Sequence, residues 1–419
     1  MENMQAANDN RSGFKIFSGD KVLWVIVTAL AVISVLVVYS STAKMGYNPR
    51  LARTTADFLR QHLILLAMCV PVLLVVHKIN CRIYNRFAVL FYVVGVIMTV
   101  AVYFTNNITN GAARWISIFG FQFQPSEALK IATVILLARQ LAARQSIIDR
   151  LRIVPSLNPV RWFRDPKQKK IWREGTLPVL APVVVSCLVI FKAHTSSAIL
   201  VFGVSLVMMF IGRVRMSELL KVVGLAVAGL LLATLLNLGR TETASGRVST
   251  WFDLWTTSQV DKDVRNLTDT ERSMIAIHEG GLFGRGAGRS AVRVEMTHPE
   301  SDYIYAFFVE EYGMILALAV LMLYLWIFFR GMEIFTRCET AFPGLLVLGL
   351  VLLITCQALL HIMVTVNIIP ETGQNLPLIS RGGSSMLFTA IAIGMVLSVS
   401  RQNDEKSHDK PRGESMMER

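Results

Sequence analysis

Arginines and carboxylates gather in one stretch of this chain, GRGAGRSAVRVEMTHPESDYIYAFFVEEY, which runs from Gly284 to Tyr312. Its arginines Arg285, Arg289 and Arg293 recur every four residues. A guanidinium group binds phosphate through paired, charge-assisted hydrogen bonds. The alternating glycines around the first two arginines disfavour a regular helix and would let backbone amides approach a phosphate closely. The stretch therefore predicts a phosphate site, with a flexible, solvated loop as the alternative.

Two acids, Glu300 and Asp302, stand directly before a hydrophobic run. A carboxylate at the boundary between water and lipid loses part of its hydration, which would raise the pKa of Asp302 towards that of a useful general base. The alternative is an ordinary helix N-terminal carboxylate, with Ser301 as a second candidate for the cap. Glu310 and Glu311 fall inside the same run, where charge is costly, so we expect them to form structural pairs. The arginines and the base together suggest an enzyme that acts on a phosphorylated lipid.

The composition is that of a polytopic membrane protein, with 53% hydrophobic residues, 17% charged residues and a mean hydropathy of +0.50. Crossing the hydrocarbon core takes at least ~17 mostly apolar residues. The sequence predicts an all-α fold with ten transmembrane helices, at residues 22–41, 62–77, 87–105, 126–143, 177–193, 196–212, 218–238, 303–329, 343–366 and 382–400. The fourth is interrupted by charges, and it is included because the basic loops would otherwise fall on alternating sides.

The distribution of basic residues predicts the orientation. The loop from Arg139 to Arg173 holds ten Lys or Arg but only two Asp, as expected of a cytoplasmic loop. Both termini then lie in the cytoplasm. The predicted regions are a cytoplasmic N-terminal segment at 1–21, a membrane domain at 22–400 and a disordered cytoplasmic tail at 401–419. A large outer loop at 239–302 joins the seventh and eighth spans. No cleavable signal is evident, so the first span is expected to remain in the membrane.

The sequence favours neither a nucleic-acid site nor a site built on cysteines. The net charge of +13 sits mostly in the inner loop and tails, with no basic stripe interleaved with stacking aromatics, so no nucleic-acid partner is expected. The five cysteines are scattered in or beside the spans without C-x-x-C spacing. They predict neither a metal site nor a disulfide framework.

Further candidates lie outside the arginine stretch. Glu127 and Lys130, which we include as candidate substrate-binding residues, have the spacing of an ion pair at the start of the fourth helix. Arg114, beside Trp115, could reach a lipid headgroup or serve as an interfacial anchor. The irregular stretch from residue 370 to residue 385 is expected to line a cavity, because irregular backbone at membrane depth must be covered by protein or water. It ends in Ser384 and Ser385, which we include as candidate substrate-binding residues.

Four stretches together resemble the SEDS family (shape, elongation, division and sporulation), typified by FtsW and RodA. They occur in family order and read NGAARWISIFGFQFQPSEALK, GRVSTWFDLW, the arginine stretch itself and LPLISRGGSS. The resemblance implies a peptidoglycan glycosyltransferase of the bacterial inner membrane that polymerises lipid II, and overall similarity favours the division type over the elongation type. It also implies a class B penicillin-binding transpeptidase as partner, alongside other division or elongation membrane proteins. Two departures are KAHTSSA at residues 192–198, where members often carry a proline–aspartate–x–glycine run, and Arg381, where many have tyrosine.

The family's essential aspartate matches Asp302, although the short interval in H-P-E-S-D-Y leaves Glu300 as a substitute. Asp302 would deprotonate the sugar hydroxyl of the acceptor lipid II, which attacks the anomeric carbon of the growing chain, linked to undecaprenyl pyrophosphate. Arg247 and the arginines at 285, 289 and 293 would stabilise the leaving pyrophosphate. A divalent cation, Mg²⁺ or Mn²⁺, could assist, although no dedicated ligand cluster is evident. The alternatives are a flippase for lipid-linked precursors and a division scaffold without catalysis. The exposed faces of the eighth and ninth spans are the expected docking surface.

Overall fold

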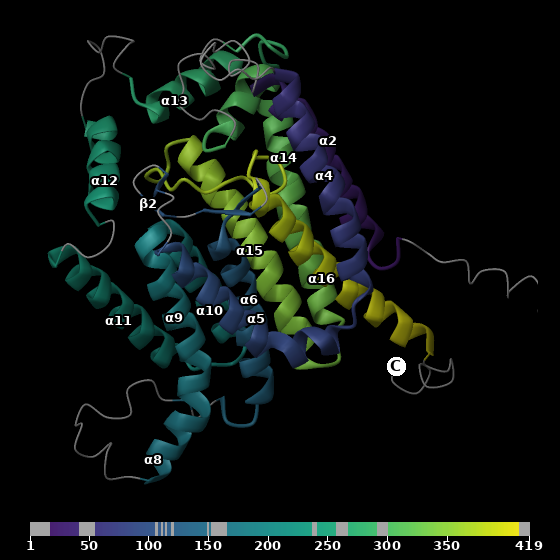
Figure 1. Ribbon diagram of the computed structural model, residues 1–419, viewed down its shortest axis with the longest axis vertical. Helices are drawn as coiled ribbons and strands as arrows, with labels where there is room; N and C mark the ends of the chain where they lie inside the picture. Colours follow the sequence, from purple (N-terminus) through teal and green to yellow (C-terminus); the bar gives the residue numbers. More distant parts are fainter. Residues whose placement is uncertain are drawn as a thin grey trace, which may run out of the picture.

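The computed structural model describes residues 17–41, 55–104, 108–109, 112–113, 115–118, 121–148, 151, 166–236, 241–256, 267–290 and 301–409. These residues form a bundle of long helices with two small antiparallel hairpins (Figure 1). The elements are α2 Lys21–Ser41, α4 Thr55–Lys78, α5 Cys81–Val102, β1 Ile108–Thr109, β2 Ala112–Ala113, β3 Ile116–Ile118, β4 Phe121–Phe123, α6 Pro125–Ala143, α8 Pro166–Ile171, the π-helix Trp172–Thr176, α9 Leu177–Ala193, α10 Thr195–Ile211, α11 Met216–Leu235, α12 Thr241–Thr256, α13 Asp269–Gly280, α14 Ile304–Thr336, α15 Ala341–Thr365 and α16 Gly383–Asp409.

Each of the ten predicted spans coincides with a helix, and the predicted all-α membrane fold is confirmed. Within the described residues, eight helices are long and apolar enough to cross a membrane. The other two coinciding helices are α10, which is apolar but shorter, and α6, which carries charged residues. The number ten therefore stays a prediction.

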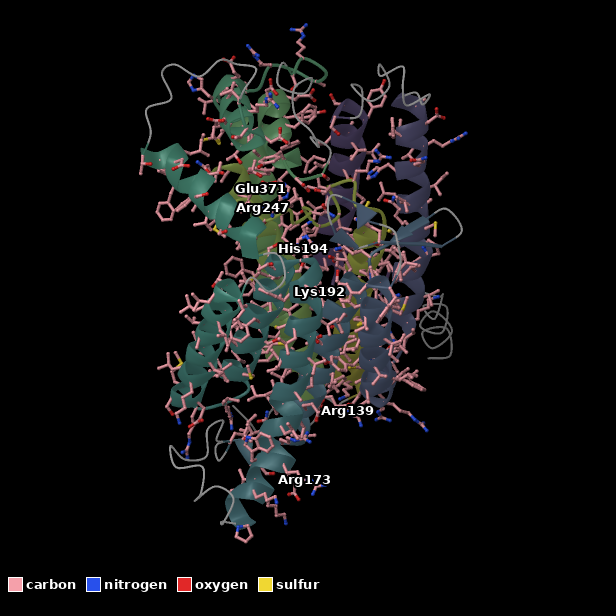
Figure 2. The ribbon with its side chains drawn as sticks, turned by 60° about the vertical axis from the view of Figure 1, so that its left-hand side comes forward. Arg139, Arg173, Lys192, His194, Arg247 and Glu371 are labelled. Carbon is pink, nitrogen blue, oxygen red and sulfur yellow. The ribbon has the colours of Figure 1, made fainter. Side chains whose placement is uncertain are left out.

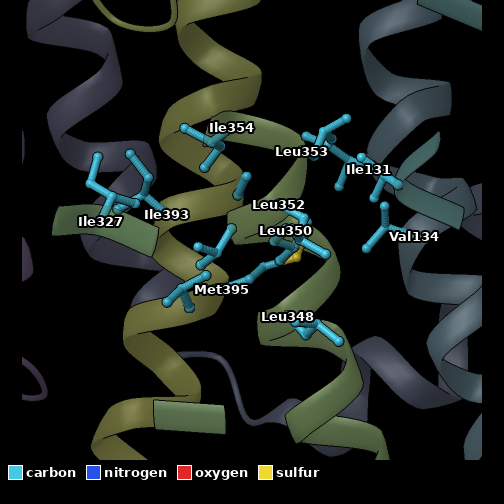
Figure 3. Close-up of a cluster of buried hydrophobic side chains, with 14 of the residues drawn as sticks. Ile131, Val134, Ile327, Leu348, Leu350, Leu352, Leu353, Ile354, Ile393 and Met395 are labelled. Carbon is cyan, nitrogen blue, oxygen red and sulfur yellow. The ribbon is translucent and has the colours of Figure 1, made fainter. Parts of the chain in front are cut away.

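The core of the bundle is formed by its last two helices. The apolar windows of α15 and α16 are 83% and 78% buried, whereas those of α4 and α11 are each 17% buried. A helix that is apolar on all sides suits such a central position. Leucines of α15, including Leu350 and Leu353, pack there with Ile131 of α6 and Ile393 of α16 (Figure 3).

The helix that follows Asp302 is not one continuous span. Its backbone breaks at Gly313, where φ is 85° and ψ is 167°. The Tyr305 hydroxyl donates to the carbonyl of Ala317 at 3.0 Å. Residues twelve positions apart in a straight helix are separated by about 18 Å along the axis, beyond the reach of a tyrosine side chain. The segment before Gly313 therefore folds back against the segment after it, and the prediction of one regular helix from residue 303 was wrong.

The break is held by residues 281–290, the loop that follows α13, which we call the glycine loop. The amides of Met314 and Ile315 donate to the carbonyls of Gly281 and Leu282, at 3.0 and 3.4 Å. A Cβ on Gly313 would lie 2.4 Å from the Leu282 carbonyl oxygen. Because no side chain fits at that distance, the close approach requires glycine here.

Two other predicted regions contain more regular structure than expected. The predicted outer loop contains α12 and α13, which lie near one end of the bundle, while α8 lies near the other (Figure 1). A reciprocal pair of hydrogen bonds between Thr268 and Glu271 caps the start of α13. The predicted disordered tail begins as helix, because α16 continues to Asp409. Residues 410–419 lie outside the described residues.

Candidate active site

Asp302 lies in a turn immediately before α14 and is half-buried. The helix cap is Tyr303, whose own side chain makes no capping hydrogen bond. The Ser301 hydroxyl donates to Oδ1 of Asp302 at 3.1 Å. The N-cap position is therefore taken by Tyr303 and not by Asp302 or Ser301.

The irregular segment between α15 and α16 holds this turn in place. The buried Ser380 hydroxyl donates to the carbonyl of Ser301 at 2.9 Å and accepts the amide of Leu376 at 2.8 Å. The Tyr324 hydroxyl, inside α14, donates to the carbonyl of Pro377. Asp302 is thus positioned by segments about 75 residues later in the chain, which brings two of the family-like stretches together.

An arginine from α12 reaches the same region. Nε of Arg247 lies 3.7 Å from Oε2 of Glu371, and its Nη1 donates to the Glu371 carbonyl at 3.4 Å. Figure 2 shows the two residues side by side, with His194 and Lys192 below them. The Trp251 indole, one turn along α12, donates to the carbonyl of Asn367 at 3.1 Å. Two residues of α12, Arg247 and Trp251, therefore join it to the chain between α15 and α16.

The acids of this region influence one another. The pKa of Glu371 is raised, chiefly because burial disfavours its charge; Arg247 opposes the shift, and the negative charges of Asp302 and Asp269 add to it. The pKa of Tyr303 is also raised, first by burial and then by the charge of Glu371. The Tyr303 hydroxyl lies 2.9 Å from Oγ of Thr270 on α13. Asp302 and Glu371 therefore belong to one electrostatic cluster.

The predicted pair in α6 is present and deeply placed. Nζ of Lys130 lies 2.8 Å from Oε1 of Glu127, and the Lys130 side chain is 1% exposed. Lys130 also donates to Oε1 of Gln357 at 2.9 Å, whose amide donates to the carbonyl of Asn375 at 3.1 Å. This chain of contacts links α6, through α15, to the segment that holds Asp302.

The two predicted serines occupy the start of α16. Oγ of Ser384 accepts the amide of Gln124 at 3.0 Å, which ties α16 to the start of α6. Ser385 is also buried. The contact of Ser384 is structural, and the predicted role of the two serines in substrate binding stays a prediction.

A polar junction between α9 and α10 lies against the same segment. The Ser196 hydroxyl donates to the carbonyl of Thr372 at 2.7 Å. The amide of Gln374 donates to the hydroxyls of Ser196 and Ser197, at 3.1 and 2.9 Å. Nδ1 of His194 lies 2.9 Å from the Ser196 hydroxyl oxygen and 3.3 Å from the amide nitrogen of Gln374, so the same junction includes His194. The KAHTSSA departure therefore has a structural role here.

The predicted glycine and arginine site is built differently from our expectation. The amides of Arg285 and Gly286 donate to the carbonyls of Glu310 and Glu311, at 2.9 and 3.0 Å. The Gly288 amide lies 2.8 Å from Oε1 of Glu311. These amides are already used by α14, so the expected phosphate cradle of backbone amides is not formed.

The Arg285 side chain also contacts protein carboxylates. Nη2 of Arg285 lies 2.7 Å from Glu279, and its Nη1 lies 3.9 Å from Glu310. Oε1 of Glu311 accepts the Ser40 hydroxyl at 2.7 Å, and the buried Ser290 hydroxyl donates to Glu310. The structural pairing expected of the two glutamates is confirmed.

The predicted arginine cluster is divided between two places. Arg285 lies by Glu310, separated from Asp302 by the helical segment that begins α14, about 12 Å long at 1.5 Å per residue. Arg289 is exposed on the same glycine loop. Of the predicted arginines in the described residues, Arg247 is the one placed in the electrostatic cluster of Asp302.

Three predicted residues, Arg114, Arg293 and Glu300, lie outside the described residues. Within the described part of the chain, no group of three or more His, Cys, Asp or Glu side chains could hold a metal ion. Three residues that contact this region, Glu371, Gln357 and Gln374, were not predicted from the sequence. Glu371 and Gln374 belong to the irregular stretch that the sequence did single out, but their partners lie in α12 and at the α9–α10 junction.

The comparison with known proteins settles the family. A family model described as a cell cycle protein, FtsW/RodA/SpoVE, matches residues 20–405. The chain belongs to this family. The SEDS resemblance of the four stretches is thereby confirmed, over nearly the whole chain.

Individual members of the FtsW/RodA/SpoVE family align over most of their length. A probable peptidoglycan glycosyltransferase FtsW of Polynucleobacter necessarius is 26% identical over 392 residues, 92% of this chain and 86% of that one. A structure described as structural coordination of polymerization and crosslinking by a peptidoglycan synthase complex is similar with a TM-score of 0.63, at 20% identity, covering 92% of this chain and 98% of that one. The rod shape determining protein RodA of Thermus thermophilus is similar with a TM-score of 0.58 at 20% identity, covering 92% and 97%. At these identities the two structures show the shared fold.

Proposed function

We propose that this chain is a peptidoglycan glycosyltransferase that polymerises lipid II into glycan strands at the outer face of the bacterial cytoplasmic membrane. The observation that carries the proposal is the setting of Asp302, a half-buried carboxylate that is held in one cluster with Arg247 and Glu371. Membership of the FtsW/RodA/SpoVE family and the names of its relatives support the reaction.

In the proposed reaction, Asp302 accepts the proton of a sugar hydroxyl on the acceptor lipid II. The hydroxyl oxygen forms a bond to the anomeric carbon of the growing chain, and the bond from that carbon to undecaprenyl pyrophosphate breaks. The pyrophosphate leaves with the bonding electrons, and Arg247 stabilises its charge. Because this is a single displacement, it inverts the anomeric centre without a covalent enzyme intermediate.

The other predicted residues support this site in different ways. Glu127 and Lys130 brace the segment that holds Asp302, through Gln357. Arg285 and Arg289 belong to the glycine loop at the break in α14, where they could attract anionic headgroups. A divalent cation, Mg²⁺ or Mn²⁺, would add positive charge at the pyrophosphate, and the chain's own contribution there is Arg247.

The partner and the orientation complete the proposal. A class B penicillin-binding transpeptidase would crosslink the strands, and both termini of this chain would lie in the cytoplasm. Of the two helices expected to dock the partner, α15 is largely buried within the bundle, while α14 exposes Leu316, Trp326 and Phe329. The exposed face of α14 is therefore the better candidate surface.

The decisive test is polymerisation of labelled lipid II by the purified protein, with and without a matching transpeptidase. Loss of the proposed base should slow the reaction by at least ~10²-fold, so Asp302→Asn is expected to abolish detectable strands. Glu300→Gln is the matched control, because it neutralises the neighbouring acid and should leave the strands intact. Equal activity of all three proteins would overturn the role of Asp302.

A further inference from the structure

The contact between Arg247 and Glu371 is loose in comparison with other ion pairs of the molecule. Its closest approach between charged groups is 3.7 Å, and both side chains are 34% exposed. Arg285 approaches Glu279 to 2.7 Å, and Nε of Arg330 approaches Asp20 to 3.0 Å while its Nη2 forms a second bond. Strong guanidinium–carboxylate pairs lie at roughly 2.7–2.9 Å and are commonly bidentate. Arg247 is therefore held near Glu371 without a tight pairing.

The surroundings of Glu371 disfavour its charge. Burial is the largest effect, and Asp302 and Asp269 face it with the same sign of charge. Asp269 itself pairs with Arg272 on α13 at 3.4 Å. Glu371 therefore depends chiefly on Arg247 for any stabilisation of its charge.

The remaining groups around Glu371 are uncharged or engaged in contacts of their own. The Tyr303 hydroxyl contacts Thr270, and His194 at the α9–α10 junction contacts Ser196. Lys192 lies with its Nζ 5.0 Å from the centre of the Tyr103 ring. Arg247 is thus the cation that pairs with Glu371 among the described residues, and any anion that attracts Arg247 competes with Glu371.

We propose that Glu371 is a built-in competitor for the phosphate site of Arg247, one that holds the guanidinium until a lipid-linked pyrophosphate displaces it. This inference rests on the proposed function, since it assigns the anion that Arg247 receives. A pyrophosphate offers several oxygens in bidentate geometry and more charge than one carboxylate, so it is the stronger partner for arginine. Once Arg247 turns to the phosphate, Glu371 loses its compensating charge.

This exchange couples phosphate binding to proton uptake. The Glu371 carboxylate left beside Asp302 and Asp269 takes a proton from solvent, and it releases the proton when the phosphate leaves. Binding of the pyrophosphate should therefore tighten as the pH falls through the raised pKa of Glu371. Glu371 acts here as a specificity-determining residue, because a neutral ligand gains nothing by displacing it.

The test is binding of farnesyl pyrophosphate, a short isoprenyl pyrophosphate, to the full-length protein in detergent over a series of pH values. Glu371→Gln should raise the affinity by roughly three- to tenfold at neutral pH, the effect expected from removing one partly exposed competing charge. It should also remove the part of the pH dependence that Glu371 causes. Glu371→Asp keeps the charge and should keep the pH dependence. In the background of Arg247→Gln, which weakens binding, Glu371→Gln should give no further gain.

Two matched variants test whether the effect is local. Glu279→Gln removes the same charge beside Arg285, and Glu405→Gln removes it beside Arg401. A similar gain in either variant, an unchanged or weaker affinity in Glu371→Gln, or no binding by any protein would overturn the inference. Because binding is measured without turnover, its outcome is separate from that of lipid II polymerisation by the same preparations. Competition without polymerisation would contradict the proposed function and leave the competitor role of Glu371 supported.

Discussion

The ammonium group of Lys130 lies inside the bundle, so its charge depends on two neighbours, Glu127 and Gln357. Removing one member of a buried ion pair leaves the other charge uncompensated and typically costs about 3–5 kcal/mol, whereas replacing both members with apolar side chains is often close to neutral. We expect Lys130→Met to destabilise the protein strongly and Lys130→Met with Glu127→Leu to recover most of the loss. Thermal unfolding in detergent measures both.

A control with the same residue spacing separates burial from charge. Asp57 and Arg60 form an exposed pair at 3.6 Å, also three residues apart in one helix. Arg60→Met should change the stability by no more than about 1 kcal/mol. If the double variant at 127 and 130 is stable but does not polymerise lipid II, the pair has a role beyond packing. If it remains as unstable as Lys130→Met, the buried-charge explanation fails.

The raised pKa of Glu371 also predicts how the stability of the folded chain changes with pH. Its pKa is raised in the folded state, so over this range the folded chain binds more protons than the unfolded chain. The contribution of Glu371 to the free energy of unfolding is therefore greatest below the ordinary carboxyl pKa and is lost as the pH rises through the raised value. The unfolding midpoint of the native chain should fall relative to that of Glu371→Gln as the pH rises from the ordinary glutamate pKa of about 4.3 through the raised value. A difference that changes in the opposite direction would show that Arg247 outweighs burial.

At the scale of elements, the break in α14 depends on a contact that local sequence does not encode. The run after Asp302 is apolar on both sides of Gly313, so its pattern predicts one helix. The break forms because the glycine loop after α13 offers carbonyls to the amides of Met314 and Ile315. Hydrophobic runs were enough to predict where the helices lie, but this bend needs two distant segments to meet.

The same difference between local sequence and contacts of distant segments explains which residues of the candidate site could be predicted. Asp302 and Arg247 could be predicted because motif and residue type mark them directly. The pairing of Arg285 with Glu279 and the use of the glycine amides by Glu310 and Glu311 could not, because a glycine–arginine loop looks alike whether it faces phosphate or protein. The fold and the candidate residue Asp302 were therefore accessible from sequence, as was the local pair of Glu127 and Lys130, whereas the partners of Arg285, Glu310 and Glu311 were not.

Gly313 provides the test at this scale. A residue with a side chain at φ of 85° costs of order 1–3 kcal/mol, and its Cβ would also meet the Leu282 carbonyl oxygen at 2.4 Å. We expect Gly313→Ala to lower the unfolding midpoint and to weaken polymerisation, because the turn that carries Asp302 precedes the bent segment. Gly229→Ala, inside α11 with nothing within 4 Å of the added Cβ, is the matched control. It should be neutral or slightly stabilising, by up to about 1 kcal/mol. Equal behaviour of the two variants would contradict a required bend.

At the scale of the whole molecule, the topology depends on α6 and α10. These are the two predicted spans whose helices are not among the eight that are long and apolar enough to cross a membrane. α10 has 17 residues and is about 26 Å long, slightly less than a hydrocarbon core of about 30 Å. α6 has Glu127 and Lys130 buried against α15, so protein rather than lipid surrounds its charges. Both helices pack among neighbours that are long enough to cross, and we expect both to cross with them.

Three exposed positions distinguish whether α6 and α10 cross: Arg82 at the start of α5, Lys169 in α8 and Ser249 in α12. Single cysteines there, in a chain whose five native cysteines are replaced, would be labelled in intact cells with a thiol reagent that cannot cross the inner membrane. If α6 crosses, Arg82→Cys and Lys169→Cys share the cytoplasmic side and react only after permeabilisation. If α10 crosses, Ser249→Cys reacts from outside. Labelling of Arg82→Cys and Lys169→Cys on opposite sides would remove α6 from the spans, and labelling of Lys169→Cys and Ser249→Cys on the same side would remove α10. Since the proposed reaction needs Asp302 on the outer side, a cytoplasmic Ser249→Cys would also contradict the polymerase.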